Sequence, residues 1–350
     1  MGVRALAITI KDVARLSNVA PSTVSRVIAN SPRISEKTKL KVKEAMDELG
    51  YHPNFIARSL ANQSTRVIGL VLPNSTDVFF QNPFFPNVLR GLSDGANERQ
   101  YALQISTGKT DNEIYEGVIQ MVQGGRVDGV ILLYSRVEDK VLNYLRERNF
   151  PFVVIGKPFK DVEQITYVDN DNYIASKEAT NYLISLGHKQ IGFIGGDLNF
   201  VVTIERLLGF EKALRESDIS SKDDYIIHSE FLREGGQEAI GKLINLQDPP
   251  TALVVADDLM ALGVLNTLSE MNISVPEDIS ILSFNNVLFS ELSNPPLTSV
   301  DINIFELGYQ AAKSLIKLLE NPKEPVKRII VPHRLVKRVT CAVKTERVEL

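Results

Sequence analysis

The chain has 350 residues but only one cysteine, four histidines and no tryptophan. The lone Cys341 excludes an intramolecular disulfide and a cysteine zinc cluster, and it is typical of proteins kept in a reducing compartment. The histidines stand singly, without metal-ligand spacing. The sequence also lacks a Walker motif and a G-x-S-x-G elbow. We therefore expect no metal, no cofactor and no catalytic residue, as in a protein that is not an enzyme.

Long hydrophobic runs are missing as well. No apolar run approaches the ~18 residues of a membrane span, and the N-terminal MGVRALAITI is too short in its apolar part for a secretory signal. The sequence therefore predicts a cytoplasmic protein without a membrane segment. Its hydrophobic content of 44% is enough for real cores, and its length allows two or three domains.

Positive charge is concentrated at one end of the chain. Residues 1–66 hold 11 Lys and Arg against 5 Asp and Glu, a net charge of +6, while the whole chain carries −4 and the remaining residues therefore −10. This asymmetry is typical of an anion-binding head on an acidic body. The alternating lysines of residues 37–43 could also be only the solvated face of a helix.

The basic head has the pattern of a helix-turn-helix. Helical patterns at 9–17 and 21–29 flank a three-residue turn, and a third covers 35–50. The motif needs a small residue at the helix crossing, a turn residue that tolerates positive φ and exposed polar side chains leading the second helix. Ala14 and Asn18 meet the first two needs, and Ser22, Thr23 and Arg26 meet the third. The head is therefore predicted to bind DNA, with a small core made by Val13, Val19, Val24 and Val27.

From Val67 onward, short β-rich runs alternate with amphipathic segments, which indicates βαβ units and parallel sheets. The expected strands are 67–73, 102–107, 129–133, 152–156, 190–196, 252–256 and 280–284. The clearest helices are 87–100, 112–125, 172–187 and 258–271. Two groups of such units predict two similar lobes, with the boundary between the lobes at residues 157–168. A ligand would bind between them, at the carboxyl ends of the strands.

The residues at these strand ends suit a sugar. Sugars need planar polar groups that hold adjacent hydroxyls and an aromatic face for the ring. The candidates are Phe84, Phe85, Lys157, Arg206 (expected just before a helix), Asp257 and Asn285. Phe85 could instead belong to the lobe core, and the adjacent Asp258 could simply cap the following helix.

Two other function classes share parts of this pattern. A transport-type sugar-binding protein would have a similar core, but it would need a signal peptide and no basic head. A sugar-modifying enzyme would need paired acid and base groups, whereas Asp257 and Asp258 are adjacent at a helix start and should point apart. The sequence favours a DNA-binding regulator controlled by a small effector.

Motifs along the chain resemble the lactose/galactose repressor family of bacterial transcription regulators. The stretch TIKDVARLSNVAPSTVSRVIANSPRISEKTKLKVKEAMDELGYHPNFIARSL is similar to the family's head. IGLVLP, NPFFPNVLRG, RVDGVILL, LGHKQIGFIGG, RLLGF, ADDLMALG and VPEDISILSFNN resemble its core landmarks in order. VVIGKP and SFNNVLFSEL are most similar to maltose-operon repressors of Gram-positive bacteria. The resemblance implies an all-α helix-turn-helix head and a periplasmic-binding-protein-like α/β core of two parallel-sheet lobes.

The resemblance also implies roles for residues of the head. DNA contacts are expected from Thr9, Pro21, Ser22, Thr23, Arg26 and Asn30. The segment NFIARSL would be a hinge helix whose Leu60, with Arg58 alongside, enters the minor groove as a wedge; its apolar residues could instead pack on the head. Ala20 stands where the family favours a Ser N-cap, which should cost roughly 1 kcal/mol.

In the core, Arg206 and Asp257 match the family's effector contacts most closely, while Asn285 stands where many relatives carry Asp. The expected domains are a head at 1–52, a hinge helix and linker at 53–66 and a core at 67–345. Lobe 1 would span 67–165 and 303–330, and lobe 2 would span 166–302 and 331–345.

The predicted protein is a homodimer on a pseudo-palindromic double-stranded operator, without a C-terminal coiled coil. It would repress genes for the use of a maltose-type sugar, with a small sugar switching its operator affinity. The alternatives are a regulator that responds to purines or another metabolite, and a global catabolite regulator that uses a phosphocarrier partner.

Overall fold

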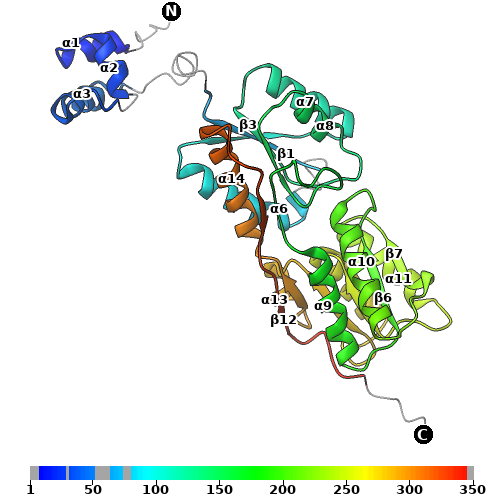
Figure 1. Cartoon of the computed structure of the whole chain (residues 1–350). Helices are drawn as coiled ribbons and strands as arrows, with labels where there is room; N and C mark the ends of the chain where they lie inside the picture. The colour runs from blue at the N-terminus through cyan, green and yellow to red at the C-terminus, as the bar shows by residue number, and fades with distance from the viewer. Residues whose placement is uncertain (1–7, 29–30, 52–63, 74–79, 345–350) are drawn as a thin grey trace, which may run out of the picture. The chain divides into compact units, whose positions relative to one another are not determined.

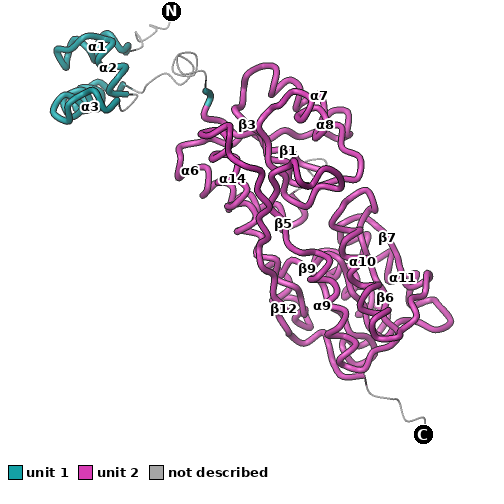
Figure 2. Tube along the Cα trace, viewed as in Figure 1, with its two compact units in different colours: residues 1–65 teal, residues 66–350 magenta. Residues whose placement is uncertain are grey.

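The computed structural model describes residues 8–28, 31–51, 64–73 and 80–344, and the chain forms two compact units, 1–65 and 66–350 (Figure 2). The predicted hinge segment and the candidates Asn30, Arg58 and Leu60 lie outside the described residues. Among the described residues, no helix is long and apolar enough to cross a membrane.

The first unit contains the three expected helices: α1 (Ile10–Leu16), α2 (Pro21–Ile28) and α3 (Glu36–Leu49). Asn18 has a φ of 49° in the turn between α1 and α2, so the predicted left-handed turn residue is confirmed. The buried core consists of Val13, Ala14, Val24, Val27, Val42 and Ala45. Val19 is only half-buried against this core, because it lies in the turn.

The first lobe of the second unit is built on a parallel sheet with the strand order β11-β5-β4-β3-β1-β2. Its strands are β1 (Val67–Val71), β2 (Ala102–Ser106), β3 (Gly129–Leu132), β4 (Phe152–Ile155), β5 (Tyr167–Asp169) and β11 (Arg328–Ile330). Helices α6 (Phe84–Asn97) and α14 (Ile304–Glu320) cover one face, and α7 (Asp111–Gln123) and α8 (Lys140–Glu147) cover the other (Figure 1).

The second lobe repeats this plan, with the strand order β12-β10-β9-β8-β6-β7. Its strands are β6 (Ile191–Gly195), β7 (Ile226–His228), β8 (Ala252–Val255), β9 (Ser280–Phe284), β10 (Thr298–Asp301) and the antiparallel β12 (Arg334–Val336). Helices α9 (Asn172–Ser185) and α10 (Val201–Glu216) pack on one face. On the other face lie α11 (Arg233–Ile244) and α12 (Asp258–Glu270). The short η1 (Asp223–Tyr225) and α13 (Leu288–Leu292) complete the lobe.

The chain passes between the lobes after β5, after β10 and after β11. One side chain joins the three passages: Asn170 donates through Nδ2 to the carbonyl oxygens of Ile302 and Val331, each at 2.9 Å. The first crossing between the lobes lies later in the chain than the sequence predicted. β5 pairs with β4, so the first lobe extends to Asp169 rather than ending at 165.

Candidate DNA-binding face and ligand pocket

The polar residues that lead α2 lie on the outside of the head. Pro21, Ser22 and Arg26 are exposed and Thr23 is half-buried, while Val24 and Val27 on the same helix face the core. A helix of this polarity can present its first turns to a DNA groove while its other face packs on α1 and α3.

Thr9 has a structural role at the start of α1. The Asp12 carboxylate accepts from the Thr9 amide at 3.0 Å and from its hydroxyl at 2.7 Å, and this pairing holds the first turn. At α2 the Ala20 side chain offers no acceptor, but its carbonyl oxygen accepts from the amides of Thr23 and Val24. The helix therefore begins at Pro21 despite the missing cap.

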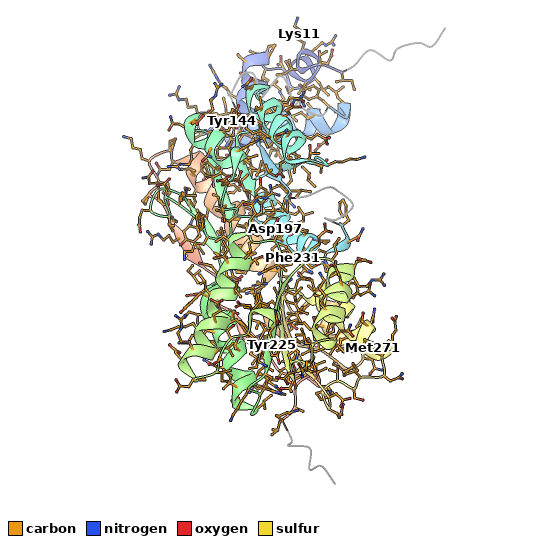
Figure 3. The ribbon with its side chains drawn as sticks, turned by 90° about the vertical axis from the view of Figure 1, so that its right-hand side faces the viewer. Lys11, Tyr144, Asp197, Tyr225, Phe231 and Met271 are labelled. Atoms are coloured by element: carbon orange, nitrogen blue, oxygen red, sulfur yellow. The ribbon has the colours of Figure 1, made fainter. Side chains whose placement is uncertain are left out.

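In the second unit, a pocket of about 140 Å³ opens where the two lobes meet. It lies at the carboxyl ends of β4, β8 and β9 and at the start of α6, as the strand pattern predicted. All six candidate effector residues line it: Phe84, Phe85, Lys157, Arg206, Asp257 and Asn285. Figure 3 shows Phe231, another lining residue, at the level where the lobes meet.

Arg206 lies inside α10 and not before a helix, which corrects the expectation. It is 4% exposed, and it donates through Nε to Asn172 Oδ1 at 3.0 Å and through Nη1 to the Ala256 carbonyl oxygen. Its guanidinium lies 4.3 Å from the centre of the Phe284 ring. Burial lowers its pKa to about 10, although the Asp257 carboxylate opposes this shift. Among the described residues the Nη2 group has no hydrogen-bond partner, so it can serve a ligand.

Asp257 is the polar centre of the pocket. Its Oδ1 accepts from the Leu259 amide at 2.7 Å and caps α12. Its Oδ2 accepts from Asn285 Nδ2 at 2.7 Å and, across the lobe boundary, from Asn82 Nδ2 at 3.0 Å. Burial raises the pKa of Asp257 to about 6, with the bond from Asn82 acting against it.

Asp258 does not cap α12, contrary to the alternative considered for it. The cap is Asp257, and the Asp258 side chain is buried in the second lobe. It accepts from one backbone amide and three hydroxyls, those of Val287, Ser283, Ser290 and Ser299. The two adjacent carboxylates thus serve different surroundings, one in the pocket and one in the lobe interior.

Two further carboxylates line the pocket and were not among the residues predicted from the sequence. Asp169 ends β5 and is buried; burial, and then the nearby Glu205, raise its pKa to about 8. Glu205 on α10 pairs with Lys157 across the lobe boundary, Oε1 to Nζ at 2.6 Å. Asp169 carried the same strand-end signal as the other candidates, but β5 has only three residues. Glu205 lies within a helix, where no strand-end pattern points to it.

Aromatic rings form the apolar walls. Phe84 and Phe85 meet edge to face at 5.2 Å, and Phe85 both packs against the lobe core and lines the pocket. Phe200 and Phe231 face them from the second lobe, with their centroids 6.2 Å apart.

Comparison with known proteins shows which families and regulators this chain is similar to. The description "Bacterial regulatory proteins, lacI family" matches residues 9–54, and "Periplasmic binding protein-like domain" matches residues 180–341. The transcriptional regulator MalR of Streptococcus pneumoniae is 42% identical over 338 residues, which cover 95% of this chain and 99% of MalR. The chain belongs to the lacI family of bacterial regulatory proteins.

Two solved structures of transcription regulators are similar to nearly the whole chain. A complex of the regulator CelR with cellobiose is 30% identical, with a TM-score of 0.76, and the match covers 95% of this chain and 99% of CelR. The lac repressor dimer bound to operator and an anti-inducer is 25% identical, with a TM-score of 0.83, over 96% of this chain and 100% of that one. The predicted family, fold class and DNA-binding regulatory function are thereby confirmed, and these relatives are transcriptional regulators.

The lobes of this lacI-family regulator are in contact around the pocket. Besides the pairs from Asn82 and Lys157, the backbone of 135–137 bridges that of 199–201: the Val137 amide donates to Asn199 at 2.9 Å, and the Val201 amide donates to Ser135 at 3.1 Å. The pocket volume of about 140 Å³ is below the roughly 300–1,000 Å³ of most small-molecule sites. A disaccharide therefore requires these contacts to loosen.

Proposed function

We propose that this regulator represses genes for the use of a maltose-type sugar and that a sugar between its lobes changes its affinity for a pseudo-palindromic operator. The observation that carries the proposal is the cluster of Arg206, Asp257 and Asn285, which lies between facing aromatic walls where the lobes meet. The likeness to MalR supports maltose as the first sugar to test, and the cellobiose complex of CelR supports a disaccharide.

In the ligand-bound state, Arg206 Nη2 and the two side chains at the ends of β8 and β9 hold adjacent hydroxyls. Phe84 and Phe85 provide an apolar face for a sugar ring. Lys157 acts mainly by closing the lobes, because its ammonium group is paired with Glu205.

In the head, we assign DNA contacts to Thr9, Pro21, Ser22, Thr23, Arg26 and Asn30, with Arg58 and Leu60 at the operator centre of a homodimer. A ligand can change DNA affinity only by binding the two lobe arrangements unequally. The Asn82–Asp257 hydrogen bond supports such a switch, because it joins the lobes through the carboxylate that a sugar hydroxyl would use.

The test is a thermal-shift screen of the full chain with maltose, cellobiose, ribose, adenine and guanine. Maltose should raise the melting temperature through mass action. The next step is a maltose titration of the protein bound to fluorescent DNA selected from a random pool, and maltose should change the DNA affinity. Asp257→Asn keeps a good helix cap but should lose most of the response.

Selective stabilisation by a purine would replace the sugar with the purine alternative. A response to maltose only in the presence of a phosphorylated carrier protein would favour the catabolite alternative. An unchanged response in Asp257→Asn would remove Asp257 from the site.

A further inference from the structure

A second cavity, of about 650 Å³, adjoins the effector pocket. Its walls come from the loop after β3, the starts of α7 and α8 and the loop between β4 and β5, and the second lobe contributes Asn199. Tyr134 lines both cavities. The volume lies within the range of about 300–1,000 Å³ that is usual for small-molecule sites.

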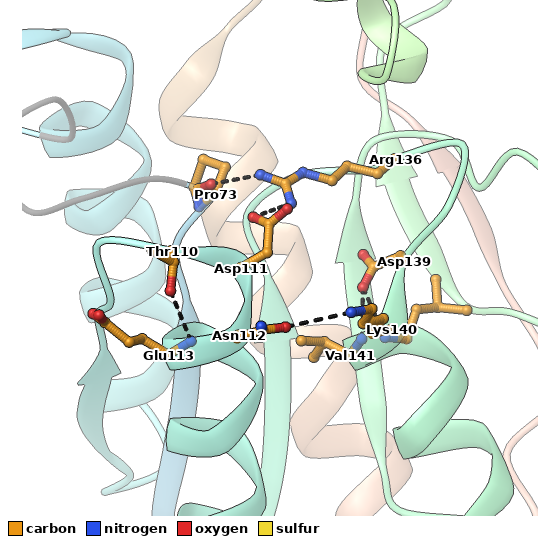
Figure 4. A network of polar contacts seen from close by, with 10 residues as sticks. Pro73, Thr110, Asp111, Asn112, Glu113, Arg136, Asp139, Lys140 and Val141 are labelled. Carbon is orange, nitrogen blue, oxygen red and sulfur yellow. Dashed lines mark hydrogen bonds and ion pairs between the residues drawn. The ribbon is translucent and has the colours of Figure 1, made fainter.

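Arg136 lines the second cavity and contacts residues that line the effector pocket. Its guanidinium lies 5.0 Å from the centre of the Tyr134 ring and 5.1 Å from that of Phe200. Nη1 donates to Asp111 and Nη2 to the Pro73 carbonyl oxygen, each at 2.7 Å (Figure 4). Nε is buried and has no hydrogen-bond partner among the described residues. One strong donor at this wall is therefore unsatisfied.

Asp139 supplies a matching acceptor. Its Oδ1 accepts from the amides of Val141 and Leu142, at 2.9 and 3.0 Å, and caps α8. Its Oδ2 is buried and also has no partner within the part of the chain that the structure describes. Both atoms are buried within side chains that line the same cavity, and a buried donor and a buried acceptor without partners call for an explanation.

The other residues that line the second cavity indicate which class of ligand fits it. Four cationic and four anionic side chains line the cavity, including Arg146 paired with Asp161, so an anion such as phosphate gains no net attraction. Phe159, which is 46% exposed, offers an aromatic face. A hydroxyl group both donates and accepts, so a hydroxyl can bond to either side chain once rotation of that side chain turns its buried atom toward the cavity.

We infer that this second cavity binds a hydroxylated sugar ring beside the effector pocket, stacked on Phe159 and bonded to Arg136 and Asp139. The inference rests on the proposed function, that this regulator senses a sugar. The ring can belong to a free sugar molecule or to the far end of an oligosaccharide whose first ring lies in the effector pocket.

The experiment is isothermal titration of the full chain with maltose and with maltotetraose. Two variants probe the cavity: Phe159→Ala removes the ring face, and Asp139→Asn keeps the helix cap while replacing an acceptor by a donor. Met271→Ala is the matched control, because Met271 is a similarly exposed apolar residue (43%) that does not line the cavity.

If the ring belongs to an oligosaccharide, one maltotetraose binds per chain, and both variants weaken it about fivefold to tenfold while maltose affinity is unchanged. If the ring is a free sugar, two maltose molecules bind per chain, and both variants weaken the second. The control should match the wild type.

Binding of one sugar per chain with unchanged affinities in both variants would overturn the second site and leave the proposed function intact. Absence of binding of either sugar to the wild type would overturn both.

Discussion

The head and the core arrange functional side chains in opposite ways. In the head, Ser22 and Arg26 are exposed while Val24 on the same helix is fully buried. In the core, Arg206 and Asp257 are each only 4% exposed and are bonded to neighbouring residues. A head residue can therefore change binding without changing folding, whereas a pocket residue contributes to both.

The largest expected effect comes from removing the head. Deletion of residues 1–65 should lower operator affinity by more than about a thousandfold, because the candidate DNA contacts are lost. The core is a separate compact unit, so its maltose-dependent thermal shift should persist. Fluorescence anisotropy with operator DNA measures the first result. Sequence-specific DNA binding by residues 66–350 alone would contradict the assignment of DNA binding to the head.

Arg206→Ala should be the most damaging single substitution. It leaves the Asn172 amide oxygen and the Ala256 carbonyl oxygen without their donor, and each buried acceptor left unsatisfied costs about 1–3 kcal/mol. The effector response should vanish as well. Urea unfolding of the full chain, followed through the core transition, measures the stability. Arg215→Ala, at an exposed position of the same helix, is the control, and equal stability of the two variants would contradict the prediction.

Asp169 should make core stability depend on pH. Its pKa rises from 3.8 to about 8 in the folded core, so the folded state holds the proton more tightly than the unfolded chain does. This contribution is fully present below pH 3.8 and is lost as pH rises through about 8. Core stability should fall by a few kcal/mol over that window. Denaturation at several pH values measures how the free energy of unfolding changes with pH, and this dependence should weaken in Asp169→Asn. An unchanged dependence would mean that another group takes up the proton.

Arg26→Ala should weaken specific DNA binding by about 1–3 kcal/mol if its guanidinium contacts a base edge, with little change in head stability. Competition titrations with operator and random DNA separate the two kinds of contact. Lys41→Ala, at an exposed position of α3, is the control. Equal losses on both DNAs would reassign Arg26 to the phosphate backbone.

The smallest effect is expected at Lys157. Its side chain is 45% exposed, and exposed ion pairs contribute at most about 1 kcal/mol. Because the pair with Glu205 joins the lobes, Lys157→Ala should speed sugar release by a few-fold in stopped-flow measurements. Lys177→Ala breaks an ion pair within the second lobe and should leave release unchanged. Identical release rates would mean that the Lys157 pair does not hold the lobes closed.

The contrast between the head and the core also explains which features could be predicted from the sequence. Ala14 and Asn18 are defined by spacing within a few residues, and the structure has both where the pattern put them. Strand ends also brought Asp257 and Asn285 to one edge, because β8 and β9 are parallel neighbours in one sheet.

Contacts between lobes left no such pattern. Asn82 meets Asp257 across 175 residues of sequence, and only the closing of the lobes brings them together. Arg206 was expected before a helix because the predicted helix began after residue 206, whereas α10 already begins at Val201. The three-residue β5 was too short to show a period, which displaced the predicted lobe boundary.

The amide of Asn170 has a mechanical consequence. Three separate chain passages between two bodies would permit bending and twisting in several directions. Here one side chain joins all three passages through two hydrogen bonds of equal length, so none can bend without moving the others. The three passages are thereby coupled at one residue. A ligand that moves one lobe then acts on all three passages together.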